Sequence, residues 1–371
     1  MTRALYLANL SGMSGGTKRA YEICKRIKAY GVEYVPVTIL TEHPKRSALN
    51  ERFVIVRDIK FGLFHAPILS KAVTEVMRIA VKEGVEAIIS AHELPTYIFT
   101  AYLGSKILRA PWSTVLQLPP KFLRTTFGKI LYPNLFKSTI VMSVSYSIAQ
   151  ELYLLSEELK KHIYVFKIPL GVDPIIGAIP PTKEGFDAIF FARLTKEKGL
   201  FDIPYIWRKV VKEIPDAKLA VAGPGNSRDI YVFKVLVKKL GIDKNIMYLG
   251  YLPKERLYSI LKASKVLIYP SYLDSFSLVV LEALAAGVPV VAYNIPAIKY
   301  AYYATRAVQK VMVGNVDETA EKAIELLQSD ELRKELSKDA AEFASRYTWD
   351  RATHEEAEIV KRIVEDKIKS P

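Results

Sequence analysis

Residues 270–294 read PSYLDSFSLVVLEALAAGVPVVAYN and decide the fold class of the chain. The apolar run Val266–Tyr269, just before this stretch, predicts a buried strand, and a helical pattern follows over Leu278–Ala286. A second apolar run, Val288–Ala292, predicts the next strand. A strand, a helix and a strand in succession indicate a parallel pair with a crossover helix, which is the unit of α/β folds.

The same alternation extends over most of the chain. Further strands are expected at Ala4–Leu7, Tyr34–Ile39, Ala87–Ser90, Ser113–Leu116, Asp187–Phe191, Leu219–Ala222 and Met247–Leu249. Helices are expected at Thr17–Ala29, Ser70–Lys82, Ser145–Ser156, Asp202–Glu213, Tyr231–Leu240 and Lys254–Ala263. Two such series predict two doubly wound domains, each a parallel sheet with helices on both faces.

The boundary between the two series is expected in the segment 168–182, IPLGVDPIIGAIPPT. Its four prolines and two glycines exclude a single regular element. We therefore expect an N-terminal domain over residues 1–168 and a C-terminal domain over residues 169–348. Residues 349–371 are predicted to form a helix that crosses back to the N-terminal domain.

The composition is that of a folded globular protein, since half of the 371 residues are hydrophobic and a quarter are charged. No apolar run reaches the roughly 18 residues that span a bilayer. The first residues, MTRALYLANLSG, lack the pattern of a signal peptide, and the single cysteine, Cys24, cannot form an internal disulfide. These features predict a cytoplasmic protein.

The net charge of +14 indicates a binding partner that is anionic, a thermophilic composition, or both. A thermophile is suggested because only four Gln and seven Asn stand against 53 Lys plus Arg. Nucleic acid is excluded as the favoured partner because no nucleic-acid-binding motif accompanies the charge. An anionic membrane surface and a phosphorylated ligand remain.

A glycine-rich loop, SGMSGG at positions 11–16, follows the first predicted strand and opens a helix. Gly12, Gly15 and Gly16 allow close approach of the backbone to an anion, which the helix N-terminus also attracts. The loop lacks the GxGxxG spacing of a dinucleotide site and the GK[ST] ending of a P-loop. The alternative is an ordinary strand–helix turn.

Two cations, Arg193 and Lys198, lie in the segment FFARLTKEKGL directly after the strand Asp187–Phe191. Open α/β sheets bind ligands at the carboxyl ends of their strands. An arginine that can contact two oxygens and a lysine that acts as a point charge suit a diphosphate there. The alternative is a solvated surface loop.

Asp274 and Glu282 flank the start of the helix that we expect to begin near Ser277. The first N–H groups of this helix can bind phosphate. Glu282 can accept hydrogen bonds from two vicinal hydroxyls such as those of a ribose, and Asp274 can reach a sugar hydroxyl. The alternative makes Asp274 a turn residue and Glu282 an ion-paired helix residue.

Taken together, these motifs resemble the retaining glycosyltransferases of family 4, also called glycosyl transferases group 1. That family has the GT-B fold, in which two Rossmann-like domains face each other across a cleft. Its glycine-rich loop, its G-R-L-x-x-x-K-G segment and its E-x7-E pair correspond here to SGMSGG, ARLTKEKG and the pair Asp274 and Glu282. Weaker matches are GVD (171–173), VAGPG (221–225), YLGYLP (248–253) and YTWD (347–350).

The resemblance implies that a hexose moves from a nucleotide-diphospho-sugar of the UDP or GDP type to a lipid-linked or glycan acceptor. It implies neither a metal nor another cofactor. The residues that it places in catalysis are Arg193, Lys198, Asp274 and Glu282, and we add His92 as a catalytic candidate on the acceptor side. The residues that it places around the donor are Gly15, Gly16, Gly223, Phe276, Ser277, Leu278, Val279 and Glu282.

Three departures from the family pattern leave the donor sugar open. The first glutamate of the pair is replaced by the shorter Asp274, so its contact with the sugar can shift or include a water. Ser275 and Ser277 stand where the family has glycines. The segment after Ala292 lacks the usual G-G-x-x-E motif.

On the acceptor side, the family often has a histidine near the anomeric carbon, and the matching position here is Gln117. A neutral amide cannot act as a base. His92 is the nearest titratable alternative, with a capping or packing role as the competing interpretation. The family is thought to need no protein nucleophile, because the leaving phosphate helps to deprotonate the acceptor, so the loss of this histidine is compatible with activity.

The segment Lys121–Ser138, KFLRTTFGKILYPNLFKS, interleaves four basic residues with four aromatic ones and contains no acidic residue. The basic residues are Lys121, Arg124, Lys129 and Lys137, and the aromatic residues are Phe122, Phe127, Tyr132 and Phe136. This pattern suits a membrane surface at the inner membrane face or a polyprenyl-phosphate acceptor. A core helix with a basic outer face explains it equally well.

Two other functions stay open at this point. A sugar-nucleotide epimerase or hydrolase shares the GT-B fold but has no acceptor. A non-catalytic scaffold would bind a nucleotide without turnover, and Asp274, Ser275 and Gln117 are compatible with it. The joint presence of Arg193, Lys198 and Glu282 favours an enzyme.

Overall fold

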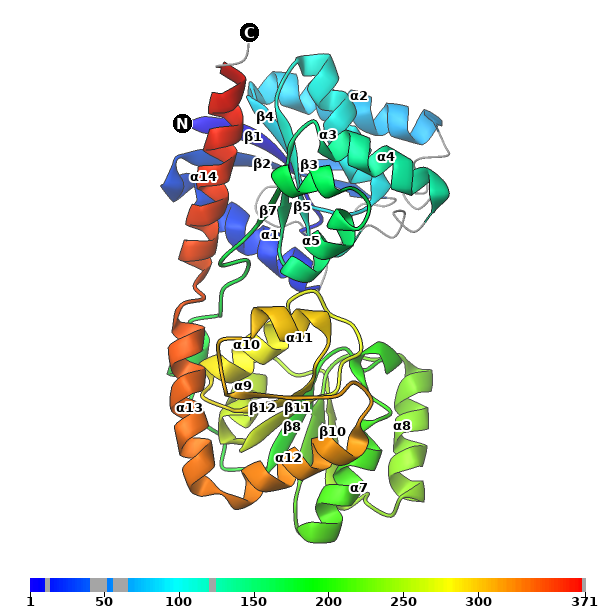
Figure 1. The fold of residues 1–371 in the computed structure, drawn as a ribbon, viewed down its shortest axis with the longest axis vertical. Coiled ribbons are helices and arrows are strands. Elements are labelled where there is room, and N and C mark those ends of the chain that lie inside the picture. Colours follow the sequence, from blue (N-terminus) through cyan, green and yellow to red (C-terminus); the bar gives the residue numbers. More distant parts are fainter. Residues whose placement is uncertain (11–13, 41–51, 56–65, 120–124, 369–371) are drawn as a thin grey trace. The chain divides into compact units, whose positions relative to one another are not determined.

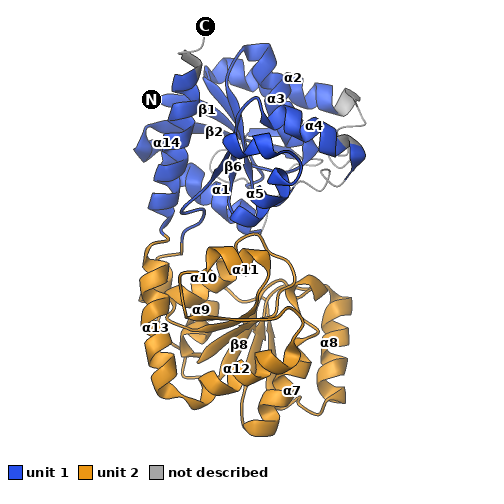
Figure 2. Cartoon of the chain, in the orientation of Figure 1, with its two compact units in different colours: residues 1–171, 348–371 blue, residues 172–347 orange. Residues whose placement is uncertain are grey.

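The computed structural model describes residues 1–10, 14–40, 52–55, 66–119 and 125–368. The chain divides into two compact units, the first formed by residues 1–171 and 348–371 and the second by residues 172–347 (Figure 2). Each unit contains one parallel β-sheet with helices on both faces (Figure 1). The predicted α/β fold with two doubly wound, Rossmann-like domains is confirmed. The chain passes between the units after Gly171 and after Tyr347, where the sequence suggested positions 168 and 348.

The first unit has a seven-stranded sheet in the order β3-β2-β1-β4-β5-β6-β7. Its strands are β1 (Thr2–Leu7), β2 (Val32–Leu40), β3 (Arg52–Ile55), β4 (Ala87–Ser90), β5 (Trp112–Leu116), β6 (Ile140–Ser143) and β7 (Ile163–Val165). Its helices are α1 (Gly15–Arg26), α2 (Ala66–Glu83), α3 (Pro95–Leu108), α4 (Thr126–Phe136), α5 (Tyr146–Tyr153) and α14 (Trp349–Ile368).

The second unit has a six-stranded sheet in the order β10-β9-β8-β11-β12-β13. Its strands are β8 (Ala188–Phe191), β9 (Leu219–Ala222), β10 (Ile246–Gly250), β11 (Val266–Tyr269), β12 (Val290–Tyr293) and β13 (Val308–Val311). Its helices are α6 (Ile175–Ala178), α7 (Ile203–Glu213), α8 (Ser227–Lys239), α9 (Lys254–Ala263), α10 (Leu278–Ala285), α11 (Pro296–Ala301), α12 (Val316–Gln328) and α13 (Asp330–Ser345).

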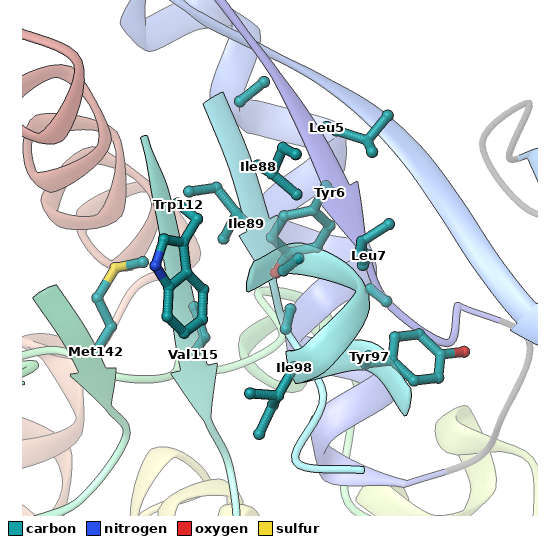
Figure 3. Packing of buried hydrophobic residues seen from close by; sticks show 14 of the residues in the cluster. Leu5, Tyr6, Leu7, Ile88, Ile89, Tyr97, Ile98, Trp112, Val115 and Met142 are labelled. Carbon is teal, nitrogen blue, oxygen red and sulfur yellow. The ribbon is translucent and has the colours of Figure 1, made fainter. Parts of the chain in front are cut away.

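Apolar side chains of the central strands form the core of the first unit (Figure 3). Ile89 of β4 and Val115 of β5 are fully buried, and Ile98 of α3 packs in the same cluster. Helix α3 was not among the predicted helices. Its sequence, PTYIFTAYLGSKIL, is apolar around most of the helix circumference and lacks the one-sided pattern by which a helix is predicted.

A buried ion pair joins α1 to α14. Arg19 and Glu356 are completely buried, with Nη2 and Oε2 2.7 Å apart. The Arg19 Nε donates to the carbonyl oxygen of Pro169 at 2.7 Å, and the Tyr34 hydroxyl donates to Glu356 Oε1 at 2.8 Å. Since a charge inside a protein is costly unless an opposite charge accompanies it, each of the two residues requires the other.

Both sheets contain a switch point, where connections from adjacent strands leave in opposite directions. In the second unit β8 continues toward β9, whereas its neighbour β11 continues toward β12. In the first unit β1 and β4 are related in the same way. The carboxyl ends of two such strands are the usual ligand-binding position in open α/β sheets.

Candidate functional site

The candidate site lies in the second unit, at the switch point between β8 and β11. The loop after β8 contains a short 3-10 helix, Lys196–Lys198, and the loop after β11 carries Asp274. Lys198 Nζ lies 3.0 Å from Asp274 Oδ2. The side chains are 14% and 18% exposed, so the pair is partly accessible from solvent. The structure thus brings together a cation and a carboxylate that the sequence predicted from separate motifs.

Backbone contacts fix the two loops against each other. Gly199 has a φ of +76°, and a Cβ at this position would lie 2.0 Å from the carbonyl oxygen of Pro270. The N–H of Tyr272 donates to the carbonyl of Glu197 at 2.9 Å. Because only glycine allows the close approach at position 199, the backbone itself places the Lys198 loop beside the Asp274 loop.

The carboxylate of Asp274 accepts three hydrogen bonds. Besides Lys198, its donors are the Tyr269 hydroxyl at 2.6 Å and the N–H of Ser275 at 2.8 Å. Burial disfavours the charged form, but the positive charge of Lys198 and these hydrogen bonds outweigh burial and lower the pKa of Asp274. Asp274 is therefore ionised at neutral pH.

Glu282 lies in the second turn of α10 and is buried, and its Oε1 accepts a hydrogen bond from the Tyr258 hydroxyl at 2.8 Å. The predicted contact of Glu282 with a ribose stays a prediction. Phe276 is also buried and packs on the rings of Tyr302 and Tyr347, with centroid distances of 5.6 and 5.8 Å. A donor contact at Phe276 would therefore involve the backbone rather than the ring.

The remaining donor residues that were predicted in the second unit lie around the same edge of its sheet. Leu278 and Val279 are the first two residues of α10, and their N–H groups have no acceptor within the helix. Gly223, which follows β9, has a φ of +137°, and a Cβ there would lie 1.8 Å from the carbonyl oxygen of Ala192. Arg193 is exposed on the loop after β8, where its charge adds to the hydrogen bonds that lower the pKa of Glu197.

Sequence reasoning missed three buried tyrosines that hold the site residues. Tyr269 binds Asp274, Tyr258 binds Glu282, and the Tyr302 hydroxyl donates to the carbonyl oxygen of Ser277 at 2.7 Å. The available signal was the high tyrosine content, 22 residues, together with the position of Tyr269 at the end of an apolar run. A buried tyrosine needs a partner for its hydroxyl, and here the partners are site residues.

Ser277, where the family pattern has glycine, adopts a left-handed backbone conformation. Its φ is +73° and its ψ is +81°, and its hydroxyl caps α10 by accepting from the N–H of Val280 at 3.4 Å. A side chain in this conformation clashes with its own backbone, at a cost of about 1–2 kcal/mol. The start of α10 therefore contains backbone strain that a glycine would not have.

Ser277→Gly is expected to raise the free energy of unfolding of the second unit by about 1 kcal/mol, because the strain is removed. Loss of the serine cap offsets only a few tenths of a kcal/mol. Urea denaturation measures the change. Ser145→Gly is the matched control, since Ser145 caps α5 at the same 3.4 Å distance but with an extended backbone, φ −154°. The control should be slightly destabilised, and equal losses in both variants would contradict the assignment of strain.

In the first unit, two of the predicted residues meet at the carboxyl ends of β1 and β5. A Cβ at Gly16 would lie 2.4 Å from Gln117 Oε1, and Gln117 Nε2 donates to the carbonyl oxygen of Ala91 at 3.1 Å. Gly15 is the first residue of α1 and has open space around its Cα. Gly12 lies outside the described residues.

His92 follows β4 at the same edge and has a packing role. Its Nδ1 accepts a hydrogen bond from the N–H of Leu94 at 3.2 Å, and its ring stacks on Tyr97 at a centroid distance of 4.8 Å. Burial lowers the pKa of His92, although Glu93 opposes this shift. His92 is therefore neutral at pH 7, and its part in catalysis stays a prediction. Within the described ranges, no group of three or more His, Cys, Asp and Glu side chains could hold a metal ion.

The segment 121–138 forms α4 in its described part. Tyr132 and Phe136 are fully buried, as the core-helix interpretation requires. Lys129 is exposed, and Lys137 forms an ion pair with Glu158, with Nζ and Oε2 2.6 Å apart. Lys121, Phe122, Arg124 and the side chain of Phe127 lie outside the described part of the structure. Among the helices that the structure does describe, none is both long enough and apolar enough to span a bilayer.

Solved structures with the same arrangement of strands and helices identify the fold class. HepE from Anabaena, in complex with UDP and glucose, matches with a TM-score of 0.77 and 14% identity over 98% of this chain and all of that one. Sucrose-phosphate synthase from Thermosynechococcus elongatus matches with a TM-score of 0.78 and 15% identity over 99% and 100% of the two chains. At such identities the likeness shows the fold alone. The protein has the GT-B fold.

The family is identified by a sequence match that lies in the second unit. Residues 174–343 match the family described as glycosyl transferases group 1. This range contains Lys198, Asp274 and Glu282 and covers nearly the whole second unit. The second unit therefore belongs to the glycosyl transferases group 1 family, as the sequence motifs predicted.

Curated relatives match in part of their length. A D-inositol 3-phosphate glycosyltransferase from Corynebacterium efficiens is 31% identical over 166 residues, which are 43% of this chain and 39% of that protein. An uncharacterized glycosyltransferase from Methanocaldococcus jannaschii is 37% identical over 109 residues, 29% and 27% of the two chains. N-acetyl-alpha-D-glucosaminyl L-malate synthase from Bacillus anthracis is 30% identical over 154 residues, 42% and 39%. The chain thus spans about two fifths or less of the length of these relatives.

Proposed function

We propose that the protein is a glycosyltransferase that transfers a hexose from a nucleotide-diphospho-sugar of the UDP or GDP type. The observation that carries this function is the contact between Lys198 and Asp274 at the switch point, shortly before the N-terminus of α10. An ammonium group and a helix N-terminus together provide the positive charge that a diphosphate needs. The family match over residues 174–343 supports the same function.

In the proposed reaction, the bond between the anomeric carbon and the diphosphate oxygen breaks. The acceptor hydroxyl forms its bond on the same face of the sugar, so the configuration is retained, and its proton passes to the leaving diphosphate. Lys198, Arg193 and the N-terminus of α10 stabilise the negative charge that develops on this group. Because protein groups supply that stabilisation, we propose that the reaction needs no metal ion and no further cofactor.

For the acceptor we propose a lipid-linked or glycan hydroxyl compound, used in the cytoplasm or at the inner membrane face. The names of the curated relatives contain D-inositol 3-phosphate and L-malate. Small anionic hydroxyl compounds therefore belong in the acceptor panel beside lipid-linked sugars and free glycans.

The function is tested by incubating the protein with UDP- and GDP-hexoses, first alone and then with each acceptor class, in the presence of EDTA. Mass spectrometry detects the product, and NMR coupling constants give the configuration at the anomeric carbon. We expect a glycosylated acceptor with the configuration of the donor. If the donor is hydrolysed and no acceptor in the panel is glycosylated, the protein is a hydrolase. If the donor binds without turnover, the protein is a scaffold.

Contact with an anionic membrane is a further part of the proposal, and it depends on basic residues rather than on Tyr132 and Phe136, which are buried. Changing Lys121, Arg124 and Lys129 together to Gln should lower the partition onto vesicles of 30% phosphatidylserine by roughly 100-fold, since each basic residue contributes about 1 kcal/mol. Vesicle sedimentation at rising salt measures the effect. Lys137→Gln is the control and should change binding less, because Glu158 already neutralises Lys137. If the wild-type protein does not sediment with the vesicles at low salt, membrane contact is excluded.

A further inference from the structure

Three side chains of the candidate site form a closed ring of hydrogen bonds. Lys198 Nζ lies 3.0 Å from Asp274 Oδ2 and 3.3 Å from the Tyr269 hydroxyl, and the Tyr269 hydroxyl lies 2.6 Å from Asp274 Oδ2. The three residues come from the 3-10 helix after β8, from the end of β11 and from the loop after β11. Tyr269 therefore connects the cation with the carboxylate. Its hydroxyl accepts a hydrogen bond from Lys198 and donates one to Asp274.

The ring determines the position of the ammonium group of Lys198. A lysine ammonium has three N–H donors. Tyr269, Asp274 and the carbonyl oxygen of Leu273, at 2.9 Å, supply three acceptors. A lysine at the end of a four-carbon chain would otherwise sample many rotamers, and here all of its donors have protein partners in one position.

Asp274 is occupied in a similar way. Lys198, Tyr269 and the N–H of Ser275 all donate to its carboxylate. Its contacts are therefore those of a residue that orients a neighbour, whereas the sequence suggested a contact with the transferred sugar. The shorter side chain of an aspartate, in place of the glutamate of the family pattern, keeps the carboxylate close to its own loop and to β11.

We propose that Tyr269 and Asp274 are positioning residues for Lys198, which they hold as a preorganised cation for the donor diphosphate. This role depends on the function proposed above. A charge that is already in place needs no reorganisation when the diphosphate leaves, and preorganised charges of this kind make the largest contributions in many enzymes. Asp274 then affects the reaction through Lys198 and not through the sugar.

The test is Tyr269→Phe, which removes one hydroxyl and keeps the ring. Titration calorimetry with UDP, UDP-glucose, GDP and GDP-glucose measures the effect. We expect the nucleoside diphosphate and its sugar nucleotide to lose affinity by the same factor, about tenfold, the usual effect of losing a hydrogen bond to a charged group. A loss confined to the sugar nucleotide would overturn the positioning role.

Tyr293→Phe is the matched control. Tyr293 is the last residue of β12, as Tyr269 is of β11, and it is also buried. Its hydroxyl donates to an aspartate, Asp202, at the same distance of 2.6 Å. The control should lose comparable thermal stability and keep donor affinity within about twofold. Equal losses of affinity in both variants would mean that Tyr269 acts only on stability.

Asp274→Asn gives a second, independent result. An amide accepts a weaker hydrogen bond from the ammonium of Lys198 than a carboxylate does. Lys198 then leaves its position, so binding of UDP and of UDP-glucose should fall together. If Asp274 contacts the sugar instead, only UDP-glucose binding falls and UDP binding stays unchanged. The second outcome would refute the positioning role and support the sugar contact that the sequence suggested.

The pH dependence of binding separates positioning from a merely structural role. The titratable groups around Asp274 are Lys198, Tyr269 and Tyr302. Tyr302 also interacts electrostatically with Glu282. Burial raises the pKa of both tyrosines, so they do not titrate in acid. Burial opposes the charged form of Asp274, but the positive charge of Lys198 and the hydrogen bonds outweigh burial and lower the pKa of Asp274. Asp274 therefore stops holding Lys198 only as the pH falls through that lowered pKa. Tyr269→Phe should move this loss to higher pH, and Tyr293→Phe should not.

A measurement without any ligand keeps this role distinct from the proposed function. The lysine ammonium signals in a ¹⁵N NMR spectrum report hydrogen-bonded, slowly exchanging groups, and Lys198→Arg assigns the signal of Lys198. We expect this signal in the wild type and its loss in Tyr269→Phe. If the wild type binds none of the four nucleotides, the proposed function fails while this result still supports the positioning of Lys198. A signal unchanged by Tyr269→Phe would overturn the positioning itself.

Discussion

Lys198→Ala is expected to lower donor turnover by about 10²- to 10³-fold, the effect of removing one preorganised charge from a developing anion. The variant loses the ammonium that lies 3.0 Å from Asp274, and it leaves that carboxylate without its counter-charge. Both changes make the site more negative where the diphosphate must bind. Initial rates of donor hydrolysis or transfer at saturating donor measure the loss.

Lys196→Ala is the control for this prediction. Lys196 belongs to the same 3-10 helix, and its side chain is exposed. It should retain near wild-type turnover and a near wild-type unfolding midpoint. Comparable rates in the two variants would show that Lys198 does not act on the donor. The proposed function would then lose the residue on which it mainly depends.

Glu356→Leu is expected to reduce the free energy of unfolding by about 3–5 kcal/mol, since it leaves a completely buried arginine without its counter-charge. In the folded protein, Arg19 Nη2 lies 2.7 Å from Glu356 Oε2, and both side chains have no exposed surface. The Tyr34 hydroxyl loses its acceptor as well. Guanidinium denaturation followed by circular dichroism measures the change.

Two further variants identify the cause of that loss. Glu358→Leu removes a charge from an exposed pair with Lys361 on the same helix and should change stability by less than about 1 kcal/mol. The double variant Arg19→Met with Glu356→Leu should be more stable than Glu356→Leu alone, because no unpaired charge remains. A double variant as unstable as the single one would show that packing, rather than charge, is responsible.

The sequence predicted most of the second unit because its elements have strong local patterns. Apolar runs such as Leu219–Ala222 and Val266–Tyr269 coincide with β9 and β11. The strands β3, β6, β7 and β13 were not predicted, although β9 and β11 are as short. Charged or polar residues interrupt the apolar pattern in β3 (RFVI) and β13 (VQKV), so only the pairing with a neighbouring strand identifies these two segments as strands.

The individual residues of the candidate site could also be predicted from their motifs. Lys198 was recognised from its place after a strand, and Asp274 and Glu282 from their spacing around a helix start. Tyr269 was not recognised, because a tyrosine at the end of an apolar run is compatible with a simple core position. Nothing in a local pattern indicates where a buried hydroxyl finds its partner.

By itself, the sequence determined the α/β class, the two doubly wound domains, and the loops and the helix start that carry the cation and the carboxylates. These features depend on neighbours within one strand, helix or turn, where the period of apolar residues and the position of glycines are sufficient. The tertiary structure alone decided that Lys198 and Asp274 are partners and that Tyr269 joins them. It also paired Arg19 with Glu356, which lie near opposite ends of the sequence. Such contacts depend on distances in space between distant segments, and the energy of a charge or hydroxyl is set by the partner that the fold brings within hydrogen-bond distance.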